Sequence, residues 1–360
     1  MKIGLFGFPL TGKTTLFNTL TGAAATVGTG GRPETHLGVA RVPDDRLDRL
    51  AVLFKPKKLT HATVDYVDAA GVQQGEGKKS ESFLQDLKSA DALMHVVRAF
   101  EDEAIPHTQG TINPSRDVAT METELILADH TVATRRTERL ELAIRKTGRD
   151  EEKRELELIR RCVEALEREQ PLREVSFSED DSRRLKGFTF LSAKPLLVVL
   201  NVAESEAGAL PQAIAGSGLA EFSRKPAVAA VAASARIESE IARLDPPDAR
   251  AFMEEMGLAE PALERIIRTS YALLGLISFF TVGEDECRAW TIRAATKAQP
   301  AAGTIHSDLE KGFIRAEVVD WKNLLDAGSM PAARERAQLR LEGKEYVVRD
   351  GDVMHIRFNV

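Results

Sequence analysis

Five short runs of apolar or small residues divide the first two thirds of the chain, at 3–6, 61–71, 92–97, 196–200 and 227–232. Each has the length of a strand, and several are apolar at every position instead of alternating. Continuous apolar runs are typical of parallel strands that are covered on both faces. The pattern therefore predicts an α/β domain built on a mostly parallel, doubly wound sheet.

A different periodicity separates the third run from the fourth. From Val118 the apolar positions step by three and four, and the same spacing resumes beyond Gly148, while most intervening residues are Glu, Arg or Lys. This spacing predicts a helical coiled-coil hairpin inserted at 113–189, with its turn at Gly148. Its second arm, 151–169, would be ~28 Å long at 1.5 Å per residue. A solvated face of mixed charge and a surface that binds a partner both remain possible interpretations.

The C-terminal part has a third character. After a breaker at 245–248, two helices are predicted at 249–256 and 261–274. The remaining pattern predicts strands at 278–281, 289–293, 313–319, 345–349 and 352–360, and a helix at 330–340. Asp350 and Gly351 predict a hairpin between the last two strands. We therefore expect a nucleotide-binding domain at 1–112 and 190–277, the helical insertion at 113–189, and a compact α+β domain at 278–360.

The first predicted strand leads into a G-x-x-x-x-G-K-[ST] motif, which is typical of a phosphate-binding loop followed by a helix. Backbone N–H groups and the positive end of the helix dipole would hold the phosphates. Lys13 would reach the β- and γ-phosphates, and the Thr14 hydroxyl would bind Mg²⁺. The predicted nucleotide-binding residues here are Gly7, Pro9, Leu10, Thr11, Gly12, Lys13, Thr14 and Thr15.

Three further motifs follow predicted strands. Asp68 and Gly71 form D-x-x-G, in which the aspartate holds Mg²⁺ through water and the glycine N–H meets the γ-phosphate. The strand at 196–200 runs into Asn201, Val202, Ala203 and Glu204, and the strand at 227–232 runs into Ser234 and Ala235. Ligands of open parallel sheets lie beyond the carboxyl ends of the strands, so these motifs are expected to line one site.

Composition restricts the class of protein more than its function. The 360 residues are 43% apolar and 29% charged with a net charge of −6, which is typical of a soluble globular protein and argues against a surface built wholly for nucleic acid. Two cysteines without C-x-x-C spacing are consistent with a reducing compartment. Lys13 and neighbouring residues interrupt any signal-peptide pattern, and no uncharged apolar stretch reaches the ~20 residues that span a bilayer. We therefore predict a cytoplasmic protein that binds neither membrane nor DNA.

Beyond these motifs, the chain resembles the Obg-like ATPases, or YchF-type family, of the translation-factor class of phosphate-loop NTPases. The resemblance extends over nearly the whole chain and is densest at 194–204, 273–281, 288–292, 305–317 and 350–360. It implies that the C-terminal part is a TGS domain with a β-grasp fold, and that the charged hairpin is the family's helical insertion. It also implies ATP as substrate, Mg²⁺ as cofactor and the ribosome as partner, with RNA contacts through the TGS or helical domain.

The resemblance also bears on the choice of base. The segment from Asn201 to Glu204 occupies the place of the N-K-x-D signature, whose aspartate accepts hydrogen bonds from guanine. Adenine offers no such donors, and a glutamate carries its carboxylate one methylene further. A site built to hydrogen-bond one group can reject an analogue that lacks it by ~10⁴, so a change in this motif could reverse the base preference. The family's general preference for ATP is adopted here.

Catalysis is less well specified by the sequence. Val72 stands directly after D-x-x-G, where many GTPases use a glutamine to orient the attacking water, and valine cannot hydrogen-bond water. By resemblance, His107 is the candidate for that task, with Lys13 and Gly71 acting on the γ-phosphate. A solvated loop histidine is the competing interpretation.

The chain also departs from the family in parts that sense the γ-phosphate. Leu10 and Thr11 replace the usual Asn-Val, and Arg32 aligns with a threonine that binds Mg²⁺ in the predicted mobile loop 28–38, so Thr35 or Thr29 is expected to substitute. The segment after Gly71 is about three residues shorter than expected by resemblance. We therefore expect a slow Mg²⁺-dependent ATPase that acts as a nucleotide switch. A nucleotide-sensing module with negligible turnover and an ordinary GTPase are the alternatives.

Overall fold

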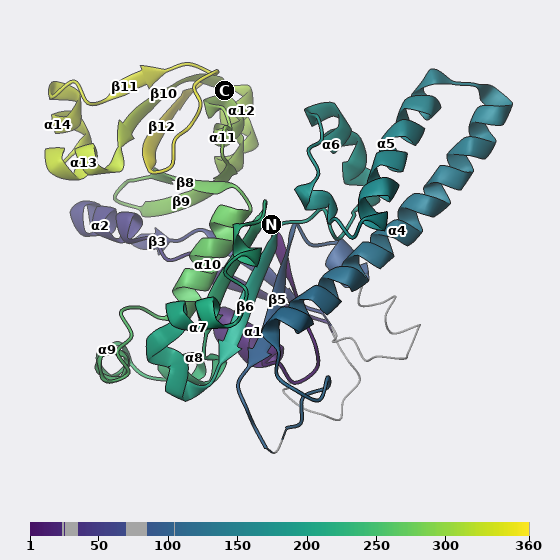
Figure 1. Ribbon diagram of the computed structural model, residues 1–360. Helices are drawn as coiled ribbons and strands as arrows, with labels where there is room; N and C mark the ends of the chain where they lie inside the picture. Colours follow the sequence, from purple (N-terminus) through teal and green to yellow (C-terminus); the bar gives the residue numbers. More distant parts are fainter. Residues whose placement is uncertain (24, 26–34, 70–84, 104, 360) are drawn as a thin grey trace. The chain divides into compact units, whose positions relative to one another are not determined.

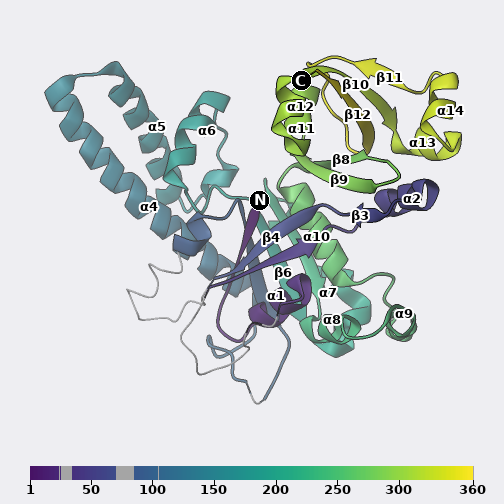
Figure 2. The same ribbon diagram turned by 180° about the vertical axis from the view of Figure 1, so that it is seen from behind.

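The computed structural model describes residues 1–23, 25, 35–69, 85–103 and 105–359 (Figures 1 and 2). Its contacts divide the chain into two compact units, one formed by residues 1–38 and 65–269 and the other by residues 39–64 and 270–360. Each contains its own buried core. No helix in the described ranges is both long and apolar enough to cross a membrane.

The nucleotide-binding part is organised by a six-stranded sheet of order β2-β4-β1-β5-β6-β7. β1 pairs in parallel with β4 and β5, and β5-β6 and β6-β7 are parallel as well, which confirms the predicted parallel sheet. β5 and β6 are buried along almost their whole length, as their continuous apolar runs require. The strands are β1 Lys2–Phe6, β2 His36–Arg41, β4 Thr63–Asp68, β5 Ala92–Ala99, β6 Leu196–Val202 and β7 Val228–Ala233.

Helices pack around this sheet and extend from it. α1 packs on β1 and α8, α4 on β5, and α7 on β7. β2 begins at His36, within the segment predicted as a loop, so the end of that prediction is wrong. The helices of this part are α1 Lys13–Thr21, α4 Pro114–Thr147, α5 Asp150–Glu167, α6 Glu179–Leu185, α7 Leu210–Gly216, α8 Ala235–Ile241, α9 Pro246–Glu255 and α10 Ala262–Leu273.

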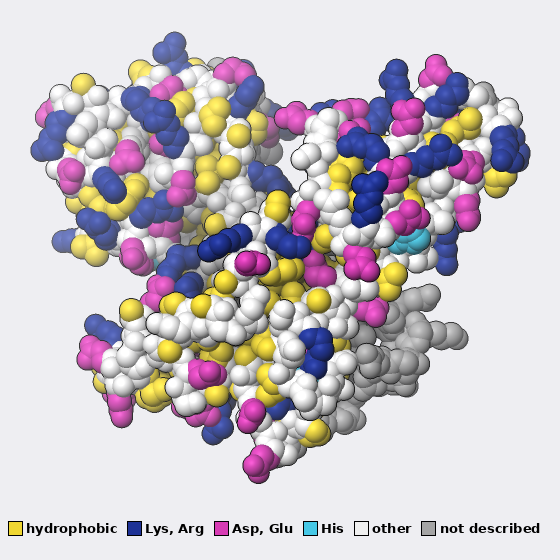
Figure 3. All heavy atoms as spheres, in the orientation of Figure 1, with side chains coloured by type: hydrophobic (Ala, Val, Ile, Leu, Met, Phe, Trp, Pro, Cys, Tyr) yellow, Lys and Arg dark blue, Asp and Glu magenta, His cyan; other side chains and the backbone are white. Residues whose placement is uncertain are grey.

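The inserted hairpin forms as predicted, with α4 and α5 packed side by side (Figure 1). The Asn113 side chain caps the start of α4, and Gly148, with φ +63°, ends it in the left-handed conformation that glycine favours. Apolar positions from both helices, including Ile126, Leu140 and Ile159, form the hairpin's own core. Outside that core, Lys and Arg alternate with Asp and Glu over the visible surface (Figure 3), which is the mixed-charge face that the sequence predicted.

A second six-stranded sheet, of order β11-β10-β12-β8-β9-β3, organises the other unit. β10 pairs antiparallel with β11 and β12, β8 pairs antiparallel with β9, and β12 pairs in parallel with β8. The elements are β3 Lys58–Thr60, β8 Leu276–Thr281, β9 Glu286–Arg293, β10 Phe313–Asp320, β11 Arg340–Glu342, β12 Asp352–Phe358, α2 Asp45–Phe54, α11 Ala298–Ile305, α12 Ser307–Lys311, α13 Trp321–Ala327 and α14 Met330–Glu335.

Two sequence predictions for this unit are wrong. The helix predicted at 330–340 ends at Glu335, and a short strand begins at Arg340. The predicted hairpin around Gly351 does not form, since no strand precedes the turn. The turn instead makes hydrogen bonds to Ser278 of β8. The Ser278 N–H donates to Asp350 Oδ1 at 2.9 Å, and the Gly351 N–H donates to the Ser278 carbonyl at 2.8 Å. The turn is therefore tied to β8.

Residues 39–64 belong to the same compact unit as the C-terminal residues, which the sequence analysis did not anticipate. β3 extends the second sheet by pairing in parallel with β9, and Thr60 Oγ1 donates to Glu286 at 2.6 Å. In α2, Arg46 binds both Asp44 (2.8 Å) and Asp350 (2.7 Å), and its guanidinium lies 5.2 Å from the Phe280 ring centroid. These contacts make 39–64 an integral part of that unit.

Candidate functional site

The phosphate loop connects β1 to α1 through backbone conformations that most residues avoid. Gly7 has φ +143°, and a Cβ there would lie 2.4 Å from the Val96 carbonyl oxygen. Gly12 has φ +89° and directly precedes α1. Leu10 also adopts a positive φ, of 63°, although it carries a side chain. The two glycines of the motif are thus required by the path of the chain itself.

Lys13, the first residue of α1, is folded back over this loop. Its Nζ donates to the Phe8 carbonyl at 2.6 Å, and the residue is only 8% exposed. Burial lowers the pKa of Lys13 from its usual 10.5 to about 8, and the negative charge of Asp68 opposes part of that change. The ammonium group is therefore held at the loop, inside the protein.

Thr14 and Asp68 meet at the carboxyl edge of the sheet. Thr14 Oγ1 donates to Asp68 Oδ2 at 3.0 Å, and Asp68 is the last residue of β4. Burial raises the pKa of Asp68, while the Thr14 hydrogen bond and the Lys13 charge lower it. A hydroxyl and a carboxylate are hard oxygen ligands, so this pair fits Mg²⁺, which uses few protein ligands beside phosphates and water.

Asn201 at the end of β6 joins the loop to the next motif. Its Nδ2 donates to the Thr11 carbonyl and its Oδ1 accepts from the Ala235 N–H, both at 2.9 Å. A Cβ on Gly12 would lie 2.3 Å from this Nδ2. Asn201 is 5% exposed, so both of its polar atoms act as an internal brace between the phosphate loop and the start of α8.

The other residues predicted beside the base have different environments. Val202 is 3% exposed and faces the core, whereas Glu204 is accessible and its Oε1 lies 2.8 Å from Arg236 Nη1. The Ser234 hydroxyl is buried without a hydrogen-bond partner among the described residues. The predicted base-side end therefore combines the Glu204–Arg236 ion pair with a Ser234 hydroxyl that has no partner among the described residues.

His107 is placed against the base of the hairpin. Its Nδ1 accepts from the Gln109 N–H at 3.1 Å. Nε2 lies 3.0 Å from Asp117 Oδ2, and only 5% of the His107 side chain is exposed. In this conformation the imidazole is engaged with α4, and its role towards water stays a prediction.

The remaining γ-phosphate residues are only partly described. Gly71, Val72, Thr29 and Arg32 lie outside the described residues. Thr35 is described, and its hydroxyl donates to Asp86 at 2.5 Å, not to Thr14 or Asp68. The site brought together here thus consists of the phosphate loop, Asp68 and the Asn201 brace, and Thr35 stays a predicted ligand.

Comparisons with known proteins identify the family of the chain. Residues 276–359 match the family YchF-GTPase_C, described as a protein of unknown function (DUF933), and residues 2–129 match the family described as 50S ribosome-binding GTPase. The Bacillus subtilis protein named ribosome-binding ATPase YchF is 41% identical over 367 residues, covering 100% of both chains. The Pasteurella multocida protein of the same name is 40% identical over 366 residues, covering 100% of this chain and 99% of the other.

The chain belongs to the YchF family. The solved Schizosaccharomyces pombe YchF GTPase is 29% identical, covers 99% of this chain and 97% of its own, and superimposes with a TM-score of 0.85. The predicted family and the phosphate-loop α/β fold, with its long helical insertion and C-terminal α/β domain, are therefore confirmed. Within the YchF fold, the first unit is a phosphate-loop nucleotide-binding domain.

One buried residue near the YchF phosphate loop was missed by the sequence analysis. His95 on β5 stacks on Phe6 with ring centroids 4.7 Å apart, and its Cδ2 lies 3.2 Å from the place of a Cβ on Gly7. Burial, with a smaller effect of Lys13, lowers the pKa of His95 to about 3, and neither ring nitrogen has a partner among the described residues. Its signal in the sequence is a histidine inside an otherwise apolar strand.

Proposed function

We propose that this protein is a Mg²⁺-dependent NTPase that prefers ATP and acts as a nucleotide switch. The convergence of Lys13, Thr14 and Asp68 at one edge of the sheet carries this proposal. Bound Mg²⁺ would supply charge stabilisation for phosphoryl transfer, with Thr14 and Asp68 holding it. Lys13 would exchange its bond to the Phe8 carbonyl for phosphate oxygens.

The ATP preference is supported by the ion pair at the base-side end. In N-K-x-D proteins a free aspartate accepts two guanine donors, but here the Glu204 carboxylate is longer and faces Arg236. Adenine has no donors that need this carboxylate, so ATP does not have to break the pair. Relatives named ribosome-binding ATPase are consistent with the same preference.

Competition binding of ATP and GTP tests the preference directly. We expect at least tenfold tighter ATP binding by the natural chain, and a shift towards GTP in the double variant Glu204→Asp with Arg236→Ala. Glu206→Gln, an exposed neighbour in the same segment, is the matched control and should leave the ratio unchanged. Equal affinity of the natural chain for both nucleotides would contradict the proposal.

Slow hydrolysis is proposed because the candidate for holding water is engaged elsewhere. His107 contacts Asp117 and the Gln109 N–H, so it must leave those partners to reach an attacking water. His107→Ala is expected to lower ATP turnover with little change in ATP affinity. If turnover and affinity both stay unchanged, His107 has no place in the mechanism.

The proposed partner is the ribosome in the cytoplasm, and the relatives' names support it. RNA could be contacted through the predicted TGS domain or through the charged hairpin. Phosphate release measured with and without ribosomes separates the two functions considered. Stimulated release is expected of the switch, whereas a nucleotide-sensing module would bind ATP and release no phosphate in either condition.

A further inference from the structure

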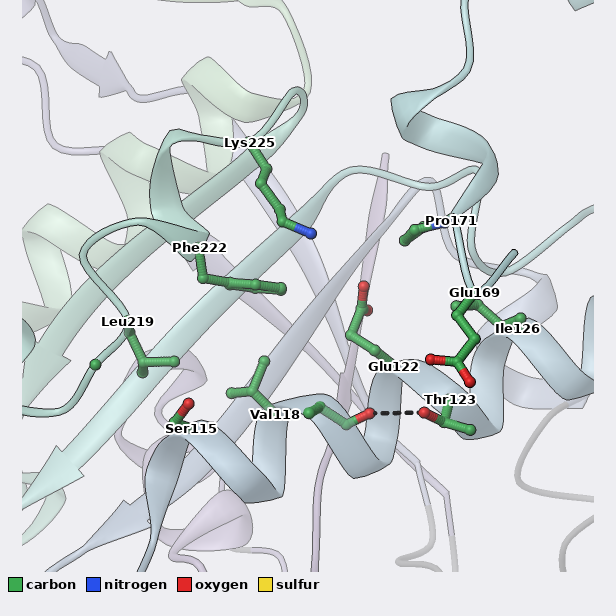
Figure 4. Close-up of a pocket in the computed structure, with 12 residues that line it drawn as sticks. Ser115, Val118, Glu122, Thr123, Ile126, Glu169, Pro171, Leu219, Phe222 and Lys225 are labelled. Atoms are coloured by element: carbon green, nitrogen blue, oxygen red, sulfur yellow. Dashed lines mark hydrogen bonds between the residues drawn. The ribbon is translucent and has the colours of Figure 1, made fainter. Parts of the chain in front are cut away.

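A cavity separate from the phosphate site lies in the nucleotide-binding unit, at the base of the helical hairpin. It has a volume of about 240 Å³, roughly eight waters at ~30 Å³ each. Its walls come from α4, from the connection after α5 and from the segment 218–225 (Figure 4). None of its lining residues belongs to the phosphate site.

Two carboxylates extend into this cavity (Figure 4). Glu122 on α4 is 8% exposed; its Oε2 pairs with buried Arg173, and its buried Oε1 has no hydrogen-bond partner among the described residues. A buried carboxylate oxygen without a donor is unfavourable, so a donor inside the cavity would relieve it. Glu122 therefore supplies an unused acceptor beside the cavity.

Glu169 brings the second carboxylate, from a position where the backbone favours glycine. Its N–H donates to the Leu166 carbonyl and the Gln170 N–H donates to the Ala165 carbonyl, both at 3.0 Å, as in a Schellman motif. Glu169 accordingly has φ +56°, the left-handed conformation usually taken by glycine at this point. A glutamate at a positive φ is locally unfavourable compared with glycine, and such strained positions are often found at functional sites.

The rest of the lining sets the shape and charge of a ligand. Leu219 and half-buried Phe222 form an apolar wall opposite α4. Lys225 at the rim lies 3.1 Å from Glu174, which neutralises the positive charge of the lysine. Arg173 neutralises the negative charge of Glu122 in the same way. One negative charge, that of Glu169, remains without a countercharge among these groups.

We propose that this cavity binds a small organic ammonium ion with an aliphatic chain. The ammonium would donate to Glu122 Oε1 and Glu169, and the chain would pack on Phe222 and Leu219. A single positive charge neutralises the lining, and the cavity volume suits about six to eight non-hydrogen atoms. Such a ligand would join α4 to the segment 218–225.

The test uses the full chain with n-pentylamine as probe, followed by thermal unfolding and by calorimetric titration at neutral pH. We expect a saturable rise of several degrees in Tm. The isosteric alcohol n-pentanol should give no such rise, because it lacks the charge. Glu169→Gln and Phe222→Ala should each weaken amine binding at least tenfold, and Glu167→Gln, at the exposed last residue of α5, should change it less than twofold.

Glu169→Gly makes the test decisive, because its two expected effects have opposite signs. Relief of the positive φ should raise Tm by about 1–3 °C without amine, while loss of the carboxylate should weaken amine binding at least tenfold. The proposal is overturned if pentylamine gives no saturable response up to tens of millimolar. It is equally overturned if Glu169→Gln and Glu169→Gly bind the amine as the natural chain does.

Discussion

Replacement of Asn201 gives the sharpest test of how the site is held together. Asn201→Ala removes two hydrogen bonds of 2.9 Å and leaves the Thr11 carbonyl and the Ala235 N–H without their partners. Each unsatisfied buried group costs about 1–3 kcal/mol, so the two groups together predict a loss of ~2–6 kcal/mol in unfolding free energy. Water entering the polar gap would bring the loss towards the lower value.

Asn201→Asp is nearly isosteric, yet we expect it to be the more damaging change. One carboxylate oxygen can still accept from the Ala235 N–H, but the other would face the Thr11 carbonyl, which is also an acceptor. The residue is 5% exposed, so repulsion between acceptors is added to the burial of a charge. We expect Asn201→Asp to lower the unfolding free energy by about 3–5 kcal/mol or more.

Urea unfolding followed by far-UV circular dichroism measures both losses, and a fluorescent ATP analogue measures binding. The affinity for nucleotide should fall at least tenfold in both variants, since the loop that holds the phosphates loses its brace. Asn323→Ala, at an exposed asparagine of α13, is the control and should stay within ~0.5 kcal/mol. The brace is refuted if Asn201→Asp is as stable as Asn201→Ala, or if neither variant differs from the natural chain.

Three further predictions concern other parts of the chain. Burial raises the pKa of Cys162 to about 12 and also raises the pKa of Cys287, so neither thiol of the native protein should react with a thiol reagent at pH 8. In the unfolded chain the Cys162 thiol ionises near its ordinary pKa of 9, so its contribution to stability should fall as the pH rises from 9 to 12. The loss is measured as a drop in Tm that is absent in Cys162→Ala. Arg46→Ala and Asp350→Asn should each destabilise the full chain by ~1–3 kcal/mol, with a coupling energy above ~0.5 kcal/mol in a double-mutant cycle; strict additivity would disprove the pairing. His95→Leu should stabilise the protein by ~1 kcal/mol in thermal unfolding because it removes two unpaired buried nitrogens, and a loss above ~2 kcal/mol would show that the imidazole has a valuable contact.

Features that depend on local sequence were predictable from the chain alone. The phosphate loop, the parallel strands and the helical hairpin follow from glycine positions, continuous apolar runs and three-to-four spacing, because each pattern acts within a few residues. Even the convergence of Lys13, Asp68 and Asn201 followed from the rule that ligands lie at the carboxyl ends of parallel strands.

Features set by packing between distant segments were not predictable. Nothing within 39–64 indicates that β3 will pair with β9 or that Arg46 will bind Asp350. Arg46 and Asp350, for example, are 304 residues apart in the sequence. The wrong hairpin at Gly351 has the same cause, because Asp350 is a turn residue locally but a partner of Ser278 in the folded unit. Local turn preference was overridden by a tertiary bond.

The base-side end of the site shows how the two kinds of information combine. The sequence has a glutamate where guanine-binding proteins use an aspartate, and Val202 where they use a lysine. The structure adds Arg236, whose guanidinium lies 2.8 Å from Glu204. A guanine would have to compete with an ion pair as well as adapt to a longer side chain, whereas an adenine would leave the pair intact. Loss of base selectivity should therefore require both changes, Glu204→Asp and Arg236→Ala, and a full switch to GTP by Glu204→Asp alone would show that the arginine has no part in the selection.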